Sequence, residues 1–171
     1  MKIPQTLRIL FILVLLGSNV GCDQISKGIV RKKVEYHAEI SLIKDYLTLT
    51  KIENSGAFLS AGHSLPEPMK TIILTVSPLL ILIGAFIYVI RVNHLSHLAV
   101  TGICFIIGGG MGNIYDRIQY GSVTDFLHLN LGVFQTGIFN MADVSITIGI
   151  CMILTDLFRK ASLSTDSIDE E

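Results

Sequence analysis

The segment from Thr71 to Ile90, TIILTVSPLLILIGAFIYVI, decides the fold because it runs for 20 residues without a charged side chain. A helix of that length is about 30 Å long, which is the thickness of the hydrocarbon core of a bilayer. Three further apolar segments lie on either side of it. The sequence therefore predicts a mainly α-helical membrane protein with four transmembrane helices, at about 9–26, 71–90, 95–115 and 138–158.

The composition supports a membrane protein and excludes one class of partner. Half of the 171 residues are hydrophobic and 16% are charged, and the mean hydropathy is +0.61. An ordinary soluble domain is more polar than this. The net charge of −1 offers no basic surface to a nucleic acid, so no nucleic-acid partner is expected. The length suits a single domain, which we place at residues 1–160.

The first apolar run, residues 9–20, has two interpretations. It follows a basic N-terminus and ends shortly before Cys22, so it resembles a secretory or lipoprotein signal that is removed in front of that cysteine. A lipoprotein signal normally has a Leu-like residue three positions before the cysteine, where this chain has Asn19. Because three further spans follow, we expect an uncleaved first span. The alternative, a membrane-tethered binding module, predicts a mature chain that begins at Cys22.

Between the first two spans the periodicity becomes strand-like. Apolar and polar residues alternate over 39–42 and 46–50, as they do in strands with one buried face. Two strands alone are marginally stable, so they should rest on the ends of the spans. We expect a small β-sheet over about 37–62 that lies on the membrane surface. The acidic, Ser-rich residues 161–171 predict a disordered tail.

Polar side chains that a bilayer would reject gather at one set of span ends. An ionised group at the centre of a span costs about 2.5–3.5 kcal/mol on insertion scales, so such groups are candidates for function. Four antiparallel spans place the following residues on the same face as the strand-like segment: Asp23, Asn113, Asp116, Arg117, Asp125, Asn140 and Asp143. A functional site is therefore expected at that membrane surface.

Two of these carboxyl groups suggest acid and base chemistry. Asp143 lies five positions into the span expected from Ile138, about 7–8 Å below its edge at 1.5 Å per residue. Alone, it could be a protonated structural group. Asp125 ends the connection from the third span with apolar neighbours, so the two carboxyls could meet at one surface. Such a pair shares a proton, and an aspartyl protease uses it to activate water.

Other protease chemistries lack their parts. The sequence contains neither an H-E-x-x-H nor a G-x-S-x-G motif. His94 and His97 have no carboxylate in the same turn, and Cys22, Cys104 and Cys151 lack the paired spacing of a zinc site or redox dithiol. No metal and no organic cofactor is expected.

Five segments, taken in order, resemble the motif series of bacterial lipoprotein signal peptidases (signal peptidase II). They are DQISK at 23–27, NSGAF at 54–58, GGGMGNIYDR at 108–117, VTDF at 123–126 and FNMAD at 139–143. The resemblance implies an aspartyl protease with four spans and a small periplasmic sheet, in which Asp125 and Asp143 are catalytic. It implies supporting or substrate-binding roles for Asp23, Lys27, Asn54, Gly56, Asn113, Arg117 and Asn140.

The resemblance also implies a substrate and a location. The enzyme would cut the signal peptide from prolipoproteins just before a diacylglyceryl-modified Cys, at the periplasmic surface of the bacterial inner membrane. We expect a monomer whose partners are this substrate and membrane lipid, with the sheet acting as a cradle and lid. Arg117 would hold Asn or carboxylate side chains with its planar fork, or serve as an interfacial anchor. Gly108 and Gly112 would allow close helix packing.

One alternative function and one conflicting signal remain. A small transporter or proton-conducting subunit also keeps buried Asp and Asn residues, but residues 79–87 in the second span carry no ionisable group and the acidic residues crowd one face. Five Lys and Arg residues lie on the side of the termini and eight on the other. By the positive-inside rule alone, the termini would lie outside.

Overall fold

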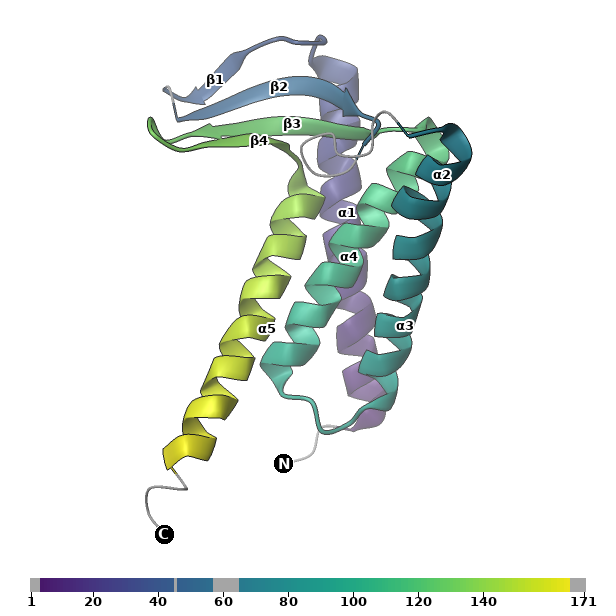
Figure 1. Cartoon of the computed structure of the whole chain (residues 1–171), viewed down its shortest axis with the longest axis vertical. Helices are drawn as coiled ribbons and strands as arrows, with labels where there is room; N and C mark the ends of the chain where they lie inside the picture. The colour runs from purple at the N-terminus through teal and green to yellow at the C-terminus, as the bar shows by residue number, and fades with distance from the viewer. Residues whose placement is uncertain (1–3, 45, 57–64, 167–171) are drawn as a thin grey trace.

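The computed structural model describes residues 4–44, 46–56 and 65–166. Long helices run side by side as a bundle, and a sheet crosses one end of it and overhangs one flank (Figure 1). The first helix begins and the last helix ends at the opposite end of the bundle from the sheet (Figure 1).

The helices account for all four expected spans. They are α1 (Gln5–Lys33), α2 (Glu67–Thr71), the π-helical turn η2 (Ile72–Val76), α3 (Ser77–Arg91), α4 (His97–Tyr120) and α5 (Met141–Asp166). Among the described residues, four helical stretches are long and apolar enough to cross a membrane, at 5–33, 67–91, 97–120 and 141–162. The prediction of a four-span, multi-pass membrane protein is confirmed.

Local signals fix the ends of α3 and α4. Ser96 caps α4, because its hydroxyl accepts a hydrogen bond from the backbone N–H of Ala99 at 3.0 Å. Gly121, with φ of 75°, ends α4 in the left-handed conformation that glycine adopts without strain. The Arg8 guanidinium of α1 donates to the carbonyl oxygens of Val89 and Val92 at 2.7 and 2.6 Å. It thereby satisfies carbonyls that the end of α3 leaves free.

The described residues form a sheet of four antiparallel strands in the order β1-β2-β3-β4. The strand-like segment supplies β1 (Ile40–Ile43) and β2 (Leu47–Asn54); residues 57–62 of that prediction lie outside the described residues. The connection between α4 and α5 supplies β3 (Val123–Asn130) and β4 (Gln135–Phe139), which the sequence interpretation missed. Half of the sheet therefore comes from the segment that also carries Asp125.

Two boundaries of the sequence interpretation were wrong. The fourth span begins at Met141 rather than at Ile138, because the apolar pair Ile138-Phe139 ends β4. Apolar composition does not distinguish a strand from the start of a span. At the other end, residues 161–166 continue α5 instead of beginning a disordered tail, since no Gly or Pro interrupts them. Residues 167–171 lie outside the described residues.

Helix α4 is the centre of the bundle. In the most apolar stretch of 18 residues in α4, half of the residues are buried inside the protein, against 11–22% in the corresponding stretches of the other spans. Glycines on α4 let α1 and α5 approach closely. A Cβ on Gly108 would lie 2.6 Å from the Cβ of Asn19, and one on Gly109 would lie 2.4 Å from the carbonyl oxygen of Ala142. The expected role of Gly108 in close packing is confirmed.

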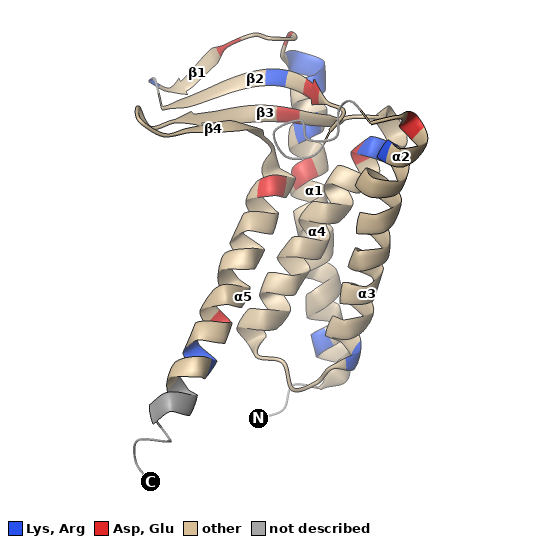
Figure 2. Cartoon of the chain, in the orientation of Figure 1, with Lys and Arg blue, Asp and Glu red and all other residues tan. Residues whose placement is uncertain are grey.

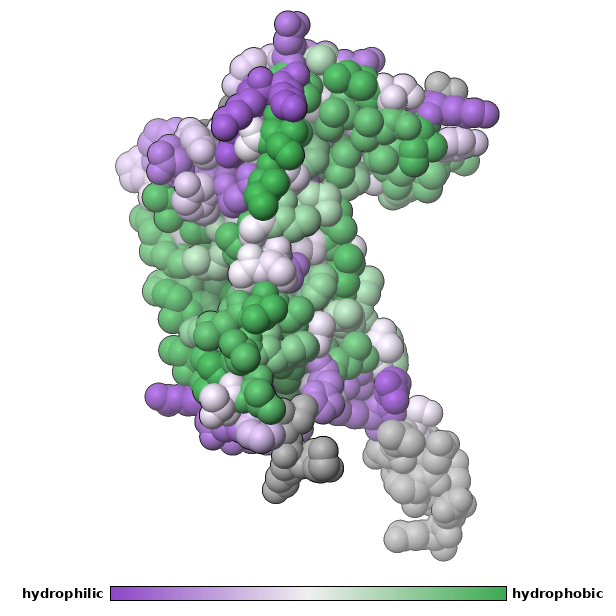
Figure 3. All heavy atoms as spheres, turned by 180° about the vertical axis from the view of Figure 1, so that it is seen from behind, coloured by the Kyte–Doolittle hydropathy of each residue, from purple (hydrophilic) through white to green (hydrophobic). Residues whose placement is uncertain are grey.

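The distribution of polar residues locates the bilayer. Lys, Arg, Asp and Glu gather at the sheet end of the bundle and again at the opposite end, while the middle of the helices has none (Figure 2). The space-filling view shows the same apolar band between two hydrophilic ends (Figure 3). The site described below therefore lies where the bundle leaves the membrane.

Candidate active site

Asn140 and Asp143 form a reciprocal cap at the start of α5. The Oδ1 of Asn140 accepts the backbone N–H of Asp143 at 3.1 Å, and the Oδ2 of Asp143 accepts the backbone N–H of Asn140 at 3.1 Å. This is the geometry of a capping box. Asp143 consequently lies in the first turn of α5, nearer the membrane surface than five positions into a span. The positive end of the helix dipole favours a carboxylate there.

Asp125 lies on β3, facing the same capping residue. Its Oδ1 accepts a hydrogen bond from the Nδ2 of Asn140 at 2.6 Å, and its Oδ2 accepts one from the Nδ2 of Asn54 at 2.9 Å. Only 4% of Asp125 is exposed. Burial raises the pKa of Asp125 to about 6; the nearby charge of Asp143 acts in the same direction, while the bonds from Asn54 and Asn140 oppose it.

The two carboxyls that the sequence singled out thus share one residue. Asn140 bonds Asp125 through its side-chain amide and Asp143 through its backbone N–H. The chain turns back on itself between β3 and β4, and α5 follows β4. This reversal brings the Asp143 carboxyl of α5 back toward the Asp125 carboxyl of β3. Two carboxyls held in this way at a membrane surface can exchange protons with a water molecule between them.

A buried relay holds the other oxygen of Asp143. The Nδ2 of Asn113, on α4, donates to the Oδ1 of Asp143 at 2.9 Å. The Oδ1 of the same amide accepts a hydrogen bond from the Nζ of Lys27 at 2.8 Å. Since an ammonium only donates hydrogen bonds, Lys27 fixes which end of the Asn113 amide faces Asp143.

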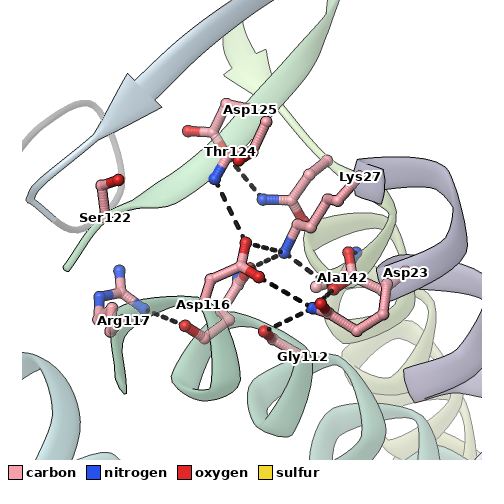
Figure 4. Close-up of polar contacts among 12 residues, drawn as sticks. Asp23, Lys27, Gly112, Asp116, Arg117, Ser122, Thr124, Asp125 and Ala142 are labelled. Atoms are coloured by element: carbon pink, nitrogen blue, oxygen red, sulfur yellow. Dashed lines mark hydrogen bonds and ion pairs between the residues drawn. The ribbon is translucent and has the colours of Figure 1, made fainter. Parts of the chain in front are cut away.

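Lys27 belongs to a charged cluster that joins α1 to α4. Its Nζ lies 2.8 Å from the Oδ2 of Asp23 and 3.1 Å from the Oδ2 of Asp116, and all three side chains are at most 1% exposed. Figure 4 shows Lys27 between the two carboxylates. Arg31 adds a second cation 2.8 Å from Asp116. Two carboxylates thus face two cations, which is the condition for burying charge without a large penalty.

The same cluster reaches α5 through Asp23. The Oδ1 of Asp23 accepts the backbone N–H of Ala142 at 2.9 Å (Figure 4). That N–H belongs to the first turn of α5, where an intrahelical partner is absent. Asp23 therefore holds the backbone of the residue before Asp143, and Asn113 holds the Asp143 side chain. The structure brings these expected supporting residues to the site.

Arg117 lies at the site but does not hold the partners expected for it. Its guanidinium donates to the carbonyl oxygens of Gly56 at 2.9 Å and Asn113 at 3.4 Å, so the bonds found in the described part of the chain go to the main chain. The backbone N–H of Gly56 in turn donates to the Oδ1 of Asn54 at 2.9 Å. Arg117 therefore ties the end of the β2 segment to α4, and with it the Asn54 amide that bonds Asp125.

Several residues of this network were not in the predicted site. Arg31, Glu53 and Thr124 are linked, because the Thr124 hydroxyl accepts from the Nε of Arg31 at 2.8 Å and donates to Glu53 at 2.8 Å. Asp116 was noted among the polar residues but given no role. Asp23, Lys27 and Arg31 follow one another at intervals of four, so the i, i+4 spacing would have found Arg31 if the first helix had been extended to Lys33.

The described residues contain no group of three or more His, Cys, Asp and Glu side chains that could hold a metal ion. The polar groups gathered at the site include carboxyls, amides, the Lys27 ammonium and the guanidinium groups of Arg31 and Arg117.

Comparison with known proteins agrees with this geometry. Residues 13–159 match the family model described as signal peptidase (SPase) II. This chain belongs to the signal peptidase II family. It is an aspartic endopeptidase, and its family removes signal peptides from lipoproteins. An enzyme assignment leaves the transporter alternative without support.

The peptidase resembles several proteins over most of its length. It is 32% identical over 136 residues to the lipoprotein signal peptidase of Aquifex aeolicus, covering 80% of this chain and 78% of the relative. It is 38% identical over 133 residues to that of Desulforapulum autotrophicum, covering 77% and 81%. A solved structure described as a bacterial membrane enzyme superposes with a TM-score of 0.80 at 27% identity, covering 90% of this chain and 91% of that one.

Proposed function

We propose that the peptidase cuts diacylglyceryl-modified prolipoproteins just before the lipidated Cys, with a water molecule activated between Asp125 and Asp143. The observation that carries this proposal is the bridging position of Asn140, which bonds both carboxyls. Two carboxyls fixed by one amide residue are oriented for a common reactant, and such preorganisation is a large part of catalysis.

The surroundings of the two carboxyls support different roles for them. Asp143 accepts two N–H bonds at the N-terminus of α5, where the helix dipole favours its anion. Asp125 is almost fully buried on β3, and the raised pKa of its carboxyl favours the acid form. We therefore assign Asp143 as the base and Asp125 as the acid.

The reaction follows from these assignments. Asp143 removes a proton from water as the water oxygen attacks the scissile carbonyl carbon, while the Asp125 proton hydrogen-bonds the carbonyl oxygen. The tetrahedral intermediate carries its charge on an oxygen next to Asp125, where the acid proton stabilises it. Its collapse breaks the C–N bond, and the proton held by Asp143 passes to the leaving amine of the Cys. The water supplies the new carboxyl oxygen, and no covalent enzyme intermediate forms.

The position of the pair suits a lipid-anchored substrate. The acyl chains and the apolar part of a signal peptide both reside in the bilayer, so the bond between them must be cut near its surface. The Asp pair lies on β3 and in the first turn of α5, at the sheet end of the bundle, where charged residues gather (Figure 2). We infer that this surface is the periplasmic face of the inner membrane and that β2, which ends at Asn54, cradles the extended substrate together with Gly56 just beyond it.

A gel-shift cleavage assay tests this proposal directly. Purified full-length peptidase in detergent is given prolipoprotein with and without the diacylglyceryl group, as wild type, Asp125→Asn or Asp143→Asn. We expect cleavage of the modified substrate only, and its loss in both variants. Asp156→Asn is the matched control, because this α5 carboxyl bonds Ser96 at the opposite end of the bundle. Near-normal turnover by a folded Asp125 or Asp143 variant would overturn the catalytic assignment.

A further inference from the structure

The hairpin between β3 and β4 differs in charge from the rest of the sheet. From Phe126 to Ala142 the chain has no Lys, Arg, Asp or Glu, whereas the neighbouring β1–β2 hairpin contains Lys44, Lys51 and Glu53. Strand order makes β4 one edge of the sheet and β1 the other. The uncharged edge is also the one joined to the bundle, because Asn140 alone separates β4 from α5.

The tip of this hairpin exposes large apolar side chains. The exposed fractions are 51% for Leu131, 108% for Val133 and 61% for Phe134. Tyr46, which is 54% exposed, lies beside them, since its carbonyl oxygen accepts the backbone N–H of Asn130 at 2.8 Å. Apolar groups of this size at the end of a hairpin are unfavourable in water. We refer to Leu131, Val133 and Phe134 as the hairpin tip.

Two backbone N–H groups of the tip turn are bonded within the turn. The N–H of Leu131 donates to the carbonyl oxygen of Phe134 at 2.8 Å, and the N–H of Gly132 donates to the Oδ1 of Asn130 at 2.9 Å. Gly132 has φ of 81°, which glycine supplies without strain. These two bonds lower the cost of moving the turn out of water, because lipid offers a backbone no hydrogen-bond partners.

The overhang places this edge of the sheet over the bilayer. The sheet projects beyond α5 on one flank (Figure 1), and the space-filling view shows an apolar underside above a hollow that continues into the apolar band of the helices (Figure 3). The helices fix the bilayer, so the underside of the overhang faces the headgroups. The continuity of this surface with the lipid-facing flank of the bundle favours lipid over a protein partner.

We propose that the hairpin tip inserts into the interfacial region of the bilayer, between the headgroups and the first part of the acyl chains. Tyr46 lies at headgroup level, where aromatic residues with a polar end are enriched. The insertion holds the sheet, and with it the strand that carries Asp125, at a constant height above the membrane. This inference concerns where the sheet rests and does not depend on the proposed reaction.

The chain offers a clean reporter because it contains no Trp. Phe134→Trp in the full-length protein, reconstituted into phosphatidylcholine and phosphatidylglycerol vesicles, gives a single emitting residue at the tip. We expect blue-shifted emission that falls about twofold with lipids brominated near the headgroup end of the acyl chain, the depth of an interfacial segment. Bromine near the methyl end should quench less.

Tyr36→Trp is the control, because this residue is 60% exposed in the connection between α1 and β1, at the end of the molecule farthest from the bundle (Figure 1). Its emission should stay unquenched. Val133→Trp repeats the test if the Phe134 variant misfolds, and far-UV circular dichroism reports folding. Solvent-like emission at both tip positions, with no quenching by either bromolipid, would overturn the proposal; quenching of all three positions alike would do so too.

Discussion

Lys27 donates a hydrogen bond to the Oδ1 of Asn113 at 2.8 Å, and this bond turns the amide nitrogen of Asn113 toward Asp143. A single buried ammonium group therefore orders an amide on another helix, which in turn holds a carboxyl on a third. The same ammonium pairs with Asp23 and Asp116. Stability and site geometry consequently depend on one side chain.

Lys27→Met should destabilise the peptidase by about 3–5 kcal/mol, because it leaves two buried carboxylates with one cation. Thermal unfolding in detergent measures the loss. Lys51→Met is the matched control: Lys51 is 7% exposed, but its Nζ donates to the carbonyl oxygen of Arg31 and forms no ion pair with an acid in the part of the chain that the structure describes. Loss of this hydrogen bond should lower the free energy of unfolding by about 1 kcal/mol. Equal destabilisation by the two variants would contradict the role of charge compensation.

The sequence predicted what depends on span length and on the cost of burying charge. The four spans were predicted because four apolar stretches are long enough to cross a bilayer. Asp125 and Asp143 were predicted as functional because carboxyl groups are rare in and beside membrane spans. It did not predict β3 and β4, because the apolar pair Ile138-Phe139, which ends β4, was assigned to the start of the fourth span. The depth of Asp143 was wrong for the same reason.

The network behind the two carboxyls was harder to predict. Arg31 and Glu53 lie in a segment rich in charges, where sequence gives no sign of which ones are buried. Only the folded arrangement brings Thr124 between them. Arg117 was predicted at the site, but its partners were not. They are backbone carbonyl oxygens, and every residue has one, so the residue types along the chain do not show which carbonyl lies near Arg117.

Asn140→Ser should separate the two functions of Asn140. Serine still caps α5, but it lacks the amide that bonds Asp125, and that bond lowers the pKa of the carboxyl. We expect kcat/KM to fall by about 10²-fold or more, with the loss of activity at high pH moving to still higher pH. A pH profile that superimposes on that of the wild type would rule out this role.

Asn140→Ala should lose the cap as well as the amide. We expect it to be about 1 kcal/mol less stable than Asn140→Ser, which is the usual worth of an N-cap side chain. Thermal unfolding of the two variants side by side measures the difference. Indistinguishable stabilities would mean that the bond from the Asp143 N–H contributes nothing to α5.

The pH dependence of activity follows from Asp125. Since this residue is the proposed acid, kcat/KM should decline as the pH rises above about 6, where the carboxyl loses its proton. Steady-state cleavage between about pH 5 and pH 8 measures the midpoint. A rate that keeps rising through this range would exclude Asp125 as the proton donor.

Asp125 also makes stability depend on pH. Its pKa is raised from 3.8 to about 6 in the fold, so the folded state binds the proton more tightly than the unfolded state. The stabilisation is complete below the ordinary pKa and is lost as the pH rises through about 6, by roughly 3 kcal/mol at most. The difference in unfolding free energy between wild type and Asp125→Asn should change across this window. A constant difference would contradict the shift.

Gly109→Ala should disturb the site through the backbone. A Cβ at this position would lie 2.4 Å from the carbonyl oxygen of Ala142, in the first turn of α5, so α5 must move and Asp143 with it. We expect a loss of about 1–3 kcal/mol in stability together with reduced cleavage. Gly84→Ala is the matched control, since nothing lies within 4 Å of its added Cβ. That change should leave activity intact and stabilise α3 by up to about 1 kcal/mol. If Gly109→Ala behaves like Gly84→Ala, the close approach of α4 to α5 does not position Asp143.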